Sequence, residues 1–194
     1  TQEVLKHAGE SIKGKTVAVS GFGNVAWGAC KKLAQLGAKP VTISGPDGYI
    51  YDKDGIVTDE KINYLLEMRA SGRDKAKDYA DKFGVPFYPG EKPWGVKVDI
   101  AMPCATQNEV NLEEAKKIIA NGTKYYIEVA NMPTTEDALN LFIDTEGITV
   151  APSKAVNAGG VCVSGLEMSQ NSQRLSWTAE EVDEKLHQAM INIY

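Results

Sequence analysis

Three small residues near the start of the chain have a spacing that lets a backbone approach a bound phosphate closely. Gly21, Gly23 and Ala26 occupy the positions of the pattern G-x-G-x-x-G/A. The first glycine of this pattern permits a tight turn, the second carries no Cβ between backbone and diphosphate, and the third small residue lets a helix pack on a strand. The chemistry predicted here is binding of a dinucleotide pyrophosphate.

The residues around the turn have the pattern of a strand–helix–strand unit. An apolar stretch begins at Thr16 and runs directly into the glycines. From Asn24, apolar residues recur at helical spacing until Gly37, and a β-rich segment covers residues 41–43. The start of this helix would offer free N–H groups and a positive dipole end to the phosphates. An acidic residue, Asp47, follows the second strand where a carboxylate that binds ribose is expected.

Composition narrows the class of protein. The 194 residues carry a formal net charge of −5, and no basic stripe is present, which argues against nucleic acid as a partner. No apolar run approaches the ~20 residues that span a bilayer, so no membrane association is expected. Three widely spaced cysteines fit neither a disulfide framework nor a metal site, and they indicate a reduced, cytoplasmic setting.

Alternating strand and helix patterns continue along the chain. Further strands are expected at residues 49–52, where a small hairpin would turn at Asp54–Gly55, and at 98–102, 125–129 and 148–150. Helices are expected at residues 58–70, 74–83, 111–120 and 134–144, with Thr58, Asn111 and Thr134 as N-caps. From residue 159 onward the pattern is helical, with a second helix opened by the capping box Thr178-x-x-Glu181.

This order predicts an α/β fold of the Rossmann type. The expected sheet is doubly wound and mostly parallel, with helices on both faces and a helical C-terminal segment at 159–194. Ligands of such sheets bind beyond the carboxyl ends of the strands. Three loops rich in small and amide residues follow strands, at 103–108, 130–135 and 151–160. These loops are therefore the expected walls of the binding site.

Four motifs in these segments resemble hexameric glutamate dehydrogenases, of the glutamate, leucine, phenylalanine and valine dehydrogenase superfamily. The motifs are GFGNVA (21–26), PCATQNE (103–109), ANMPTT (130–135) and NAGGV with SGLEM (157–161 and 164–168). The likeness covers essentially the whole chain. It implies that residues 1–194 are the nucleotide-binding domain, an excised piece from which the N-terminal substrate domain is absent.

The resemblance also implies an activity. The full enzyme would interconvert L-glutamate and 2-oxoglutarate plus ammonia, by reversible hydride transfer to the nicotinamide of NAD or NADP. In the family, the lysine and aspartate that transfer protons belong to the other domain, so no catalytic residue is expected here and this chain alone should be inactive. The full-length protein would be a homohexamer, whereas the fragment is expected to be a monomer or a weak dimer.

The resemblance assigns roles residue by residue. Residues of the pyrophosphate turn and its neighbouring loops are expected to bind the cofactor: Gly21, Phe22, Gly23, Asn24, Val25, Asp47, Ala105, Thr106, Asn131 and Asn157. Ser164 matches the serine that binds the distal carboxylate of the substrate, and Val161 lines the same pocket. A hydroxyl one turn into a helix can donate to a carboxylate that also feels the helix N-terminus. No metal site is expected.

The choice of nucleotide rests on the adenosine end. The second strand ends in Ser44-Gly45-Pro46-Asp47, which contains no cation for a 2′-phosphate and one carboxylate that would repel it. Phe22 places an apolar ring where NADP-type relatives tend to have a small polar residue. Both features favour NAD. Some family members with an acidic residue at this position nevertheless accept NADP, so use of both nucleotides stays open.

Two other functions stay open. A leucine, phenylalanine or valine dehydrogenase shares the fold and the glycine turn, but it would read an apolar side chain where Ser164 is polar. A nucleotide-binding module without chemistry of its own is the other, and it describes the fragment by itself. A short-chain reductase is excluded, because its Tyr-x-x-x-Lys motif occurs here only around Asp52 and around Pro89-Gly90, outside any helix.

Overall fold

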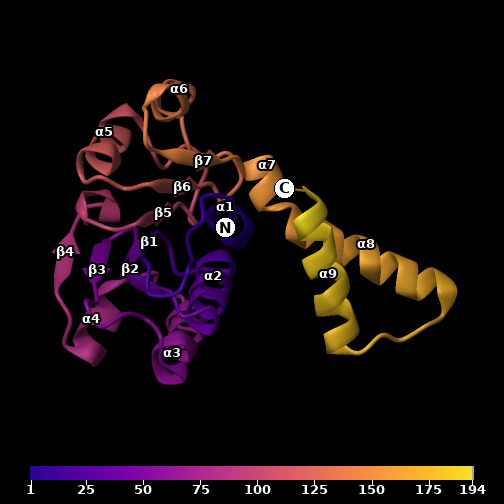
Figure 1. The fold of residues 1–194 in the computed structure, drawn as a ribbon. Coiled ribbons are helices and arrows are strands. Elements are labelled where there is room, and N and C mark those ends of the chain that lie inside the picture. The colour runs from indigo at the N-terminus through magenta and orange to yellow at the C-terminus, as the bar shows by residue number, and fades with distance from the viewer. Residues whose placement is uncertain (194) are drawn as a thin grey trace.

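A seven-stranded sheet forms the centre of the computed structural model, which describes residues 1–193 (Figure 1). Its strand order is β4-β3-β2-β1-β5-β6-β7. The strands are β1 (Thr16–Val19), β2 (Lys39–Gly45), β3 (Gly48–Tyr51), β4 (Phe87–Pro89), β5 (Ile100–Met102), β6 (Tyr125–Ile127) and β7 (Thr149–Ala151). Strands β2, β1, β5, β6 and β7 run parallel, and only the pairings of β3 with β2 and β4 are antiparallel. The predicted mostly parallel sheet is confirmed.

Helices cover both faces of this sheet (Figure 1). The α-helices are α1 (Gln2–His7), α2 (Asn24–Gln35), α3 (Asp59–Ala70), α4 (Lys77–Phe83), α5 (Leu112–Ala120), α6 (Glu136–Asp144), α7 (Ser153–Val156), α8 (Ala158–Gln173) and α9 (Ala179–Ile193). A short 3-10 helix, η1 (Pro93–Gly95), precedes β5. Residues of α1 to α4 share one buried apolar cluster, and residues of η1, α5 and α6 share the other.

Alternation along the central strands explains the two clusters. In β6, Tyr125 and Ile127 pack with α1 to α4, whereas Tyr126 packs with α5 and α6 on the opposite face. β5 repeats this pattern, with Ala101 facing α5 and α6 and its two neighbours facing the other side. Successive side chains of a strand point to opposite faces, so a strand with apolar residues at every position is buried on both.

The predicted N-caps are confirmed with one exception. Thr58 Oγ1 accepts from the Lys61 N–H, and the Asn111 side chain accepts from the Glu114 N–H. Both bonds of the Thr178–Glu181 capping box are present. Thr134 is the exception: α6 begins one residue later, with Thr135 as its N-cap. The prediction for Thr134 was wrong because its hydroxyl is buried and donates instead to the carboxylate of Glu128, the residue after β6. The helix expected from residue 74 begins at Lys77 instead, because Asp74 has a left-handed φ of 49°.

The predicted hairpin exists, but its turn lies elsewhere. β2 pairs with β3 through Ile43–Ile50 and Gly45–Gly48, so the chain turns at Pro46–Asp47 and not at Asp54–Gly55. The three-residue strand β4 then pairs with β3 and was not expected from the sequence. Short helices α1 and α7 were also missed, because six and four residues are too few for a helical repeat to stand out.

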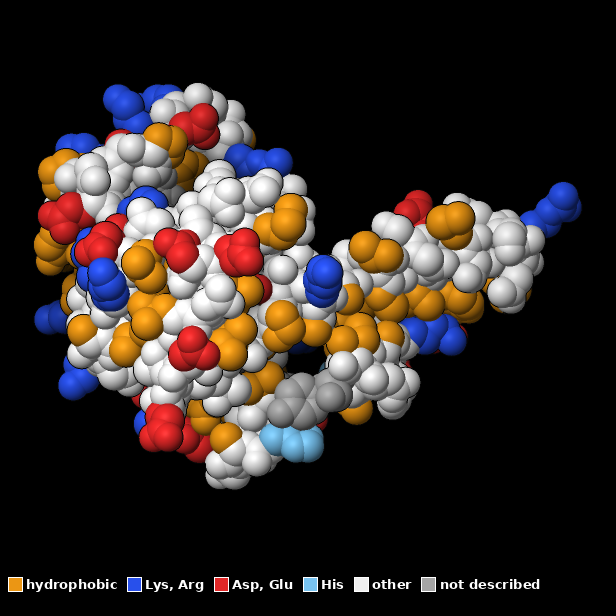
Figure 2. Space-filling view, turned by 90° about the horizontal axis from the view of Figure 1, so that it is seen from above, with side chains coloured by type: hydrophobic (Ala, Val, Ile, Leu, Met, Phe, Trp, Pro, Cys, Tyr) orange, Lys and Arg blue, Asp and Glu red, His pale blue; other side chains and the backbone are white. Residues whose placement is uncertain are grey.

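The last two long helices form an arm that projects from the sheet domain (Figure 1). Helices α8 and α9 pack on each other, and among the described residues neither helix contains a fully buried side chain. Figure 2 shows apolar side chains spread over this arm, where Val161 and Met168 of α8 are 78% and 72% exposed. The helical C-terminal segment is confirmed, and one face of it is open.

Candidate nucleotide-binding site

The predicted loops meet at one edge of the sheet. The loops follow β1, β5, β6 and β7, which are neighbours in the strand order and run parallel. Because parallel strands end at the same edge, the glycine turn lies beside loop 103–109, and loop 130–135 lies between that loop and α7. The structure thus brings the loops together at the carboxyl edge.

The glycine turn is held tightly against its neighbours. Gly21 has φ +76°, a left-handed conformation that favours glycine, and its N–H donates to Ser44 Oγ at 2.9 Å. A Cβ at Gly21 would lie 3.2 Å from the Ala105 Cβ, so the turn and loop 103–109 are in contact. Gly23 differs, since its φ is −71° and no atom lies within 4 Å of an added Cβ. The space beside Gly23 is therefore free for a ligand.

The N-terminus of α2 is prepared for an anion. No side chain caps it, and its first turn contains no acidic residue. By contrast, α3 and α5 each have a side-chain cap and two acidic residues in the first turn. Because the first N–H groups of a helix lack partners within the helix, an uncapped start above a glycine turn can donate to phosphate oxygens. This arrangement fits the diphosphate of a dinucleotide.

Loop 103–109 is fixed by a hydroxyl and a carboxylate. Ser20 Oγ accepts from the Cys104 N–H at 2.8 Å, and Glu109 Oε1 accepts from the Ala105 N–H at 2.9 Å. Burial raises the pKa of the Glu109 carboxyl, while the Ala105 N–H and the Ser20 hydroxyl act to lower it. These contacts leave Ala105 and Thr106 exposed beside the glycine turn.

Loop 130–135 is joined to loop 103–109 by backbone bonds. The Ala130 N–H donates to the Pro103 carbonyl at 2.9 Å, and the Asn108 N–H donates to the Met132 carbonyl at 3.0 Å. Asn108 and Met132 both have positive φ, at 55° and 46°. Such conformations cost of order 1–3 kcal/mol and persist where the surroundings fix them, often at binding sites. The loop presents Asn131 as an exposed side chain.

Asp47 is already engaged within the protein. Its two carboxylate oxygens accept from the Ala76 N–H at 2.8 Å and the Lys77 N–H at 3.0 Å, at the start of α4. The carboxylate therefore stabilises a helix N-terminus, and a ribose would have to share its oxygens. Its role toward a ribose stays a prediction.

Phe22 is packed inward, although it belongs to the turn. Its side chain is 7% exposed and lies in the apolar cluster of α1 to α4. A Cβ at Gly45 would lie 2.9 Å from the Phe22 ring and 2.7 Å from Asp47 Oδ1. The end of β2 is thus filled by the ring and the carboxylate. Any contact of Phe22 with a cofactor would involve its backbone and the ring edge.

The remaining predicted residues lie on the open side of the site. Asn24 and Val25 are exposed in the first turn of α2, and Asn157 is half-buried between α7 and α8. Val161 and Ser164 are exposed on α8, one turn apart, at the base of the projecting arm. The first turn of α8, like that of α2, contains no acidic residue. Both helix starts that face the site therefore suit anionic groups.

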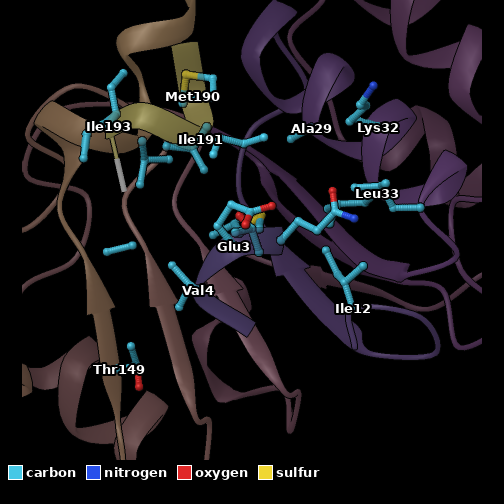
Figure 3. A pocket seen from close by; sticks show the side chains of 18 of the residues that line it. Glu3, Val4, Ile12, Ala29, Lys32, Leu33, Thr149, Met190, Ile191 and Ile193 are labelled. Atoms are coloured by element: carbon cyan, nitrogen blue, oxygen red, sulfur yellow. The ribbon is translucent and has the colours of Figure 1, made fainter. Parts of the chain in front are cut away.

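An apolar pocket of about 600 Å³ borders loop 151–160, of which residues 151, 152, 155 and 156 line it, but no residue of the glycine turn does (Figure 3). It is lined by α1, α2, β7, α7 and the end of α9, for example by Val4, Leu33 and Met190. None of the twelve predicted site residues lines this pocket. Its walls offer few polar groups to orient a nucleotide, so it is not the candidate site.

Sequence reasoning missed two features near the site. The fold brings the loop before α4 to the end of β2. Arg73 of this loop pairs with Asp78, and Lys77, the first residue of α4, pairs with Asp81. Glu109 and a second carboxylate, Glu128, which is 4% exposed, were missed as anchors of the loops. The only available signal was their place within or beside the motifs, because burial of an acid is not visible in sequence.

Comparison with known proteins identifies the family of this chain. A model of the family "Glutamate/Leucine/Phenylalanine/Valine dehydrogenase" matches residues 1–194. The chain belongs to this family. It is 72% identical over 193 residues to the NAD-specific glutamate dehydrogenase of Clostridium symbiosum, covering 100% of this chain and 43% of that protein. It is 50% identical to the NADP-specific glutamate dehydrogenase of Haemophilus influenzae, covering 100% of this chain and 42% of that protein.

A solved glutamate dehydrogenase structure superposes with a TM-score of 0.98 at 73% identity, covering 99% of this chain and 43% of that chain. The chain thus spans less than half the length of the family members it matches. The resemblance noted from the four motifs is confirmed, as is the Rossmann-type fold.

Proposed function

We propose that this chain is the dinucleotide-binding part of a glutamate dehydrogenase. The observation that carries the proposal is the start of α2, which has no side-chain cap and no acidic residue in its first turn. It directly follows the turn of Gly21 and Gly23, which contacts loop 103–109. The full enzyme would oxidise L-glutamate to 2-oxoglutarate and ammonia, reversibly. The 72% identity with a glutamate dehydrogenase supports this assignment.

The chain's own residues would bind and orient the reactants. The first N–H groups of α2 would hold the diphosphate, and Ala105 and Thr106 would lie along the adenosine side. Asn131 and Asn157 would bind the nicotinamide and its ribose, so that the nicotinamide can accept the hydride. Ser164 would donate to the distal carboxylate of glutamate, with Val161 beside it. Proton transfer would need groups outside this chain, which we expect to bind nucleotide without turning over glutamate.

NAD is the preferred nucleotide in this proposal. The end of β2 holds Phe22 and Asp47, and the nearby cations Arg73 and Lys77 are paired with carboxylates. A 2′-phosphate would therefore meet the negative charge of Asp47. Exposed Lys75, directly before Ala76, is the nearby cation that could offset this charge. Relatives with both NAD and NADP specificities occur, so use of both nucleotides is the alternative outcome.

Substrate and assembly follow the same reasoning. The family also includes enzymes that act on leucine, phenylalanine and valine, and the exposed hydroxyl of Ser164 favours an acidic side chain over these. Screening of the full enzyme with glutamate and leucine separates the two, and turnover of leucine alone would contradict our choice. We further propose a homohexameric full enzyme in the cytoplasm, where the free thiols of Cys30, Cys104 and Cys162 would stay reduced.

Titration of the chain with NADH and NADPH tests the proposal. Trp27 lies in the first turns of α2 and should report binding through quenching of its fluorescence. A Trp27→Phe variant that still enhances NADH emission would assign the signal to this residue. We expect saturable binding of both nucleotides, with NADH tighter. A folded protein that binds neither would refute dinucleotide binding, and tighter NADPH would refute the preference.

A further inference from the structure

A buried carboxylate links the two loops that carry Asn131 and Asn157. Glu128 follows β6 directly and is 4% exposed. Its Oε1 accepts from the Thr134 hydroxyl at 2.5 Å, and its Oε2 accepts from the Ser153 N–H at 2.9 Å. Thr134 belongs to loop 130–135, and Ser153 is the first residue of α7. One side chain thus holds two neighbouring loops at the carboxyl edge.

The hydrogen-bond network assigns each proton. Thr134 has a single hydroxyl proton, which it donates to Glu128. The Tyr126 hydroxyl lies 2.7 Å from Thr134 Oγ1 and must therefore be the donor of that bond. Burial raises the pKa of Tyr126, so its hydroxyl keeps the proton that it donates. The chain of bonds ends on the carboxylate, which accepts at both oxygens.

Each contact of Glu128 is close in the chain to a predicted site residue. The Asn157 N–H donates to the Ser153 carbonyl at 2.9 Å, so Asn157 is tied to the same turn that Glu128 holds. Asn131 lies three residues before Thr134, in a loop whose other backbone bonds lead to loop 103–109. The carboxylate therefore bridges the two segments that would surround a nicotinamide, from beneath and out of reach of solvent.

We propose that Glu128 is a positioning residue, which sets the distance between Asn131 and Asn157 and so shapes the nicotinamide end of the site. This inference rests on the proposed dinucleotide binding. It concerns the nicotinamide half only, because within residues 1–193 the hydrogen bonds of Glu128 go to Thr134, Ala151 and Ser153 and not to the glycine turn or residues 104–106. Loss of the bridge should weaken binding of the nicotinamide and spare the adenosine diphosphate portion.

The test compares NADH with ADP-ribose, which lacks the nicotinamide, on the 194-residue chain. Thr134→Val keeps the shape of the side chain and removes the donor to Glu128. We expect this variant to bind NADH about tenfold more weakly, equivalent to about 1.4 kcal/mol, and ADP-ribose as tightly as the wild type. The affinity of the wild type for ADP-ribose measures binding without nicotinamide contacts. Loss of those contacts alone cannot reduce the affinity for NADH below this value.

Thr123→Val is the matched control. Thr123 is likewise 4% exposed, and its hydroxyl donates to the Val98 carbonyl at 3.1 Å, before β6 and at the opposite edge of the sheet. It should change neither affinity, and it should lose less stability than Thr134→Val because only one hydrogen bond, to a neutral carbonyl, is removed. Glu128→Met gives a second reading should Thr134→Val fail to fold, since it keeps the length of the side chain and removes both carboxylate acceptors.

The outcomes separate this inference from the proposed function. Equal weakening of both ligands, or unchanged NADH binding in Thr134→Val and Glu128→Met, would overturn the role of Glu128. A wild type that binds NADH and ADP-ribose equally would also overturn it and leave dinucleotide binding intact. A folded wild type that binds neither ligand would remove the proposed function and this inference with it.

Discussion

Separate replacement of Gly21 and Gly23 by alanine should have different effects. The change at Gly21 should lower stability, and the change at Gly23 should weaken binding of the nucleotide. At Gly21 a Cβ must adopt φ +76° and would lie 3.2 Å from the Ala105 Cβ and 3.4 Å from the Cys104 carbonyl oxygen. The left-handed conformation alone costs an alanine about 1–2 kcal/mol. Because loop 103–109 is held by Ser20 and Glu109, it can yield little to the added methyl group. We expect Gly21→Ala to destabilise the protein by about 1–3 kcal/mol.

At Gly23 the same change meets neither obstacle. Its φ of −71° suits alanine, and no atom lies within 4 Å of the new Cβ. Alanine is a poorer N-cap than glycine, by up to about 1 kcal/mol, but it lowers the entropy of the unfolded chain by about 0.4–1 kcal/mol. These effects nearly cancel. Stability should therefore change by less than about 0.5 kcal/mol, whereas the methyl group would occupy the space predicted for the diphosphate.

Urea denaturation gives the stability of each variant, and fluorescence titration gives its affinity for NADH. We expect Gly23→Ala to lose at least about tenfold in affinity at wild-type stability, while Gly21→Ala loses stability first. Gly23→Ala that binds NADH as tightly as the wild type would refute the assignment of the diphosphate to this turn. Equal destabilisation by both changes would refute the inference that only Gly21 needs the left-handed conformation and lacks space for a Cβ.

Three further predictions concern the core, a carboxylate and the thiols. Phe142→Ala removes a fully buried ring whose centroid lies 4.0 Å from that of Tyr126, and urea denaturation should show a loss of about 3–5 kcal/mol. Burial raises the pKa of Glu109, so the folded state binds its proton more tightly; the stability difference between wild type and Glu109→Gln should fall as the pH rises through that pKa. Native protein should expose one rapidly reacting thiol, that of half-buried Cys162, because burial raises the pKa of Cys30 to about 12 and also raises that of Cys104.

Local signals predicted most of the fold. The strand, turn and helix from Thr16 to Gln35 depend on residues adjacent in sequence, namely an apolar run, two glycines and a helical repeat. The capping bonds of Thr58 and Asn111 are equally local, since donor and acceptor are three residues apart. Strand β4 was missed for the opposite reason. Its three residues are ordered by pairing with β3, nearly forty positions earlier in the chain.

The site was predictable in its types of residue but less so in its contacts. Thr134 and Thr135 are equivalent as caps by sequence, and only burial of the first beside Glu128 decides between them. Asp47 has the position of a ribose ligand, yet its oxygens meet Ala76 and Lys77, which lie about thirty residues later. Long-range partners of polar groups are set by the packing of the sheet, so no local pattern could indicate them.

The proposed nucleotide site and the proposed substrate site differ in how completely this chain's own residues form them. Glu109 fixes loop 103–109 internally, and Glu128 and a series of backbone bonds join the predicted nucleotide loops, so their geometry does not depend on a ligand. The residues predicted to bind the substrate lie on α8, where Val161 is 78% exposed. Sites for small molecules bury most of the ligand's surface, and one open helix face cannot do this. If glutamate is the substrate, as we propose, we therefore expect its recognition to depend jointly on Ser164 and on a second surface placed opposite α8.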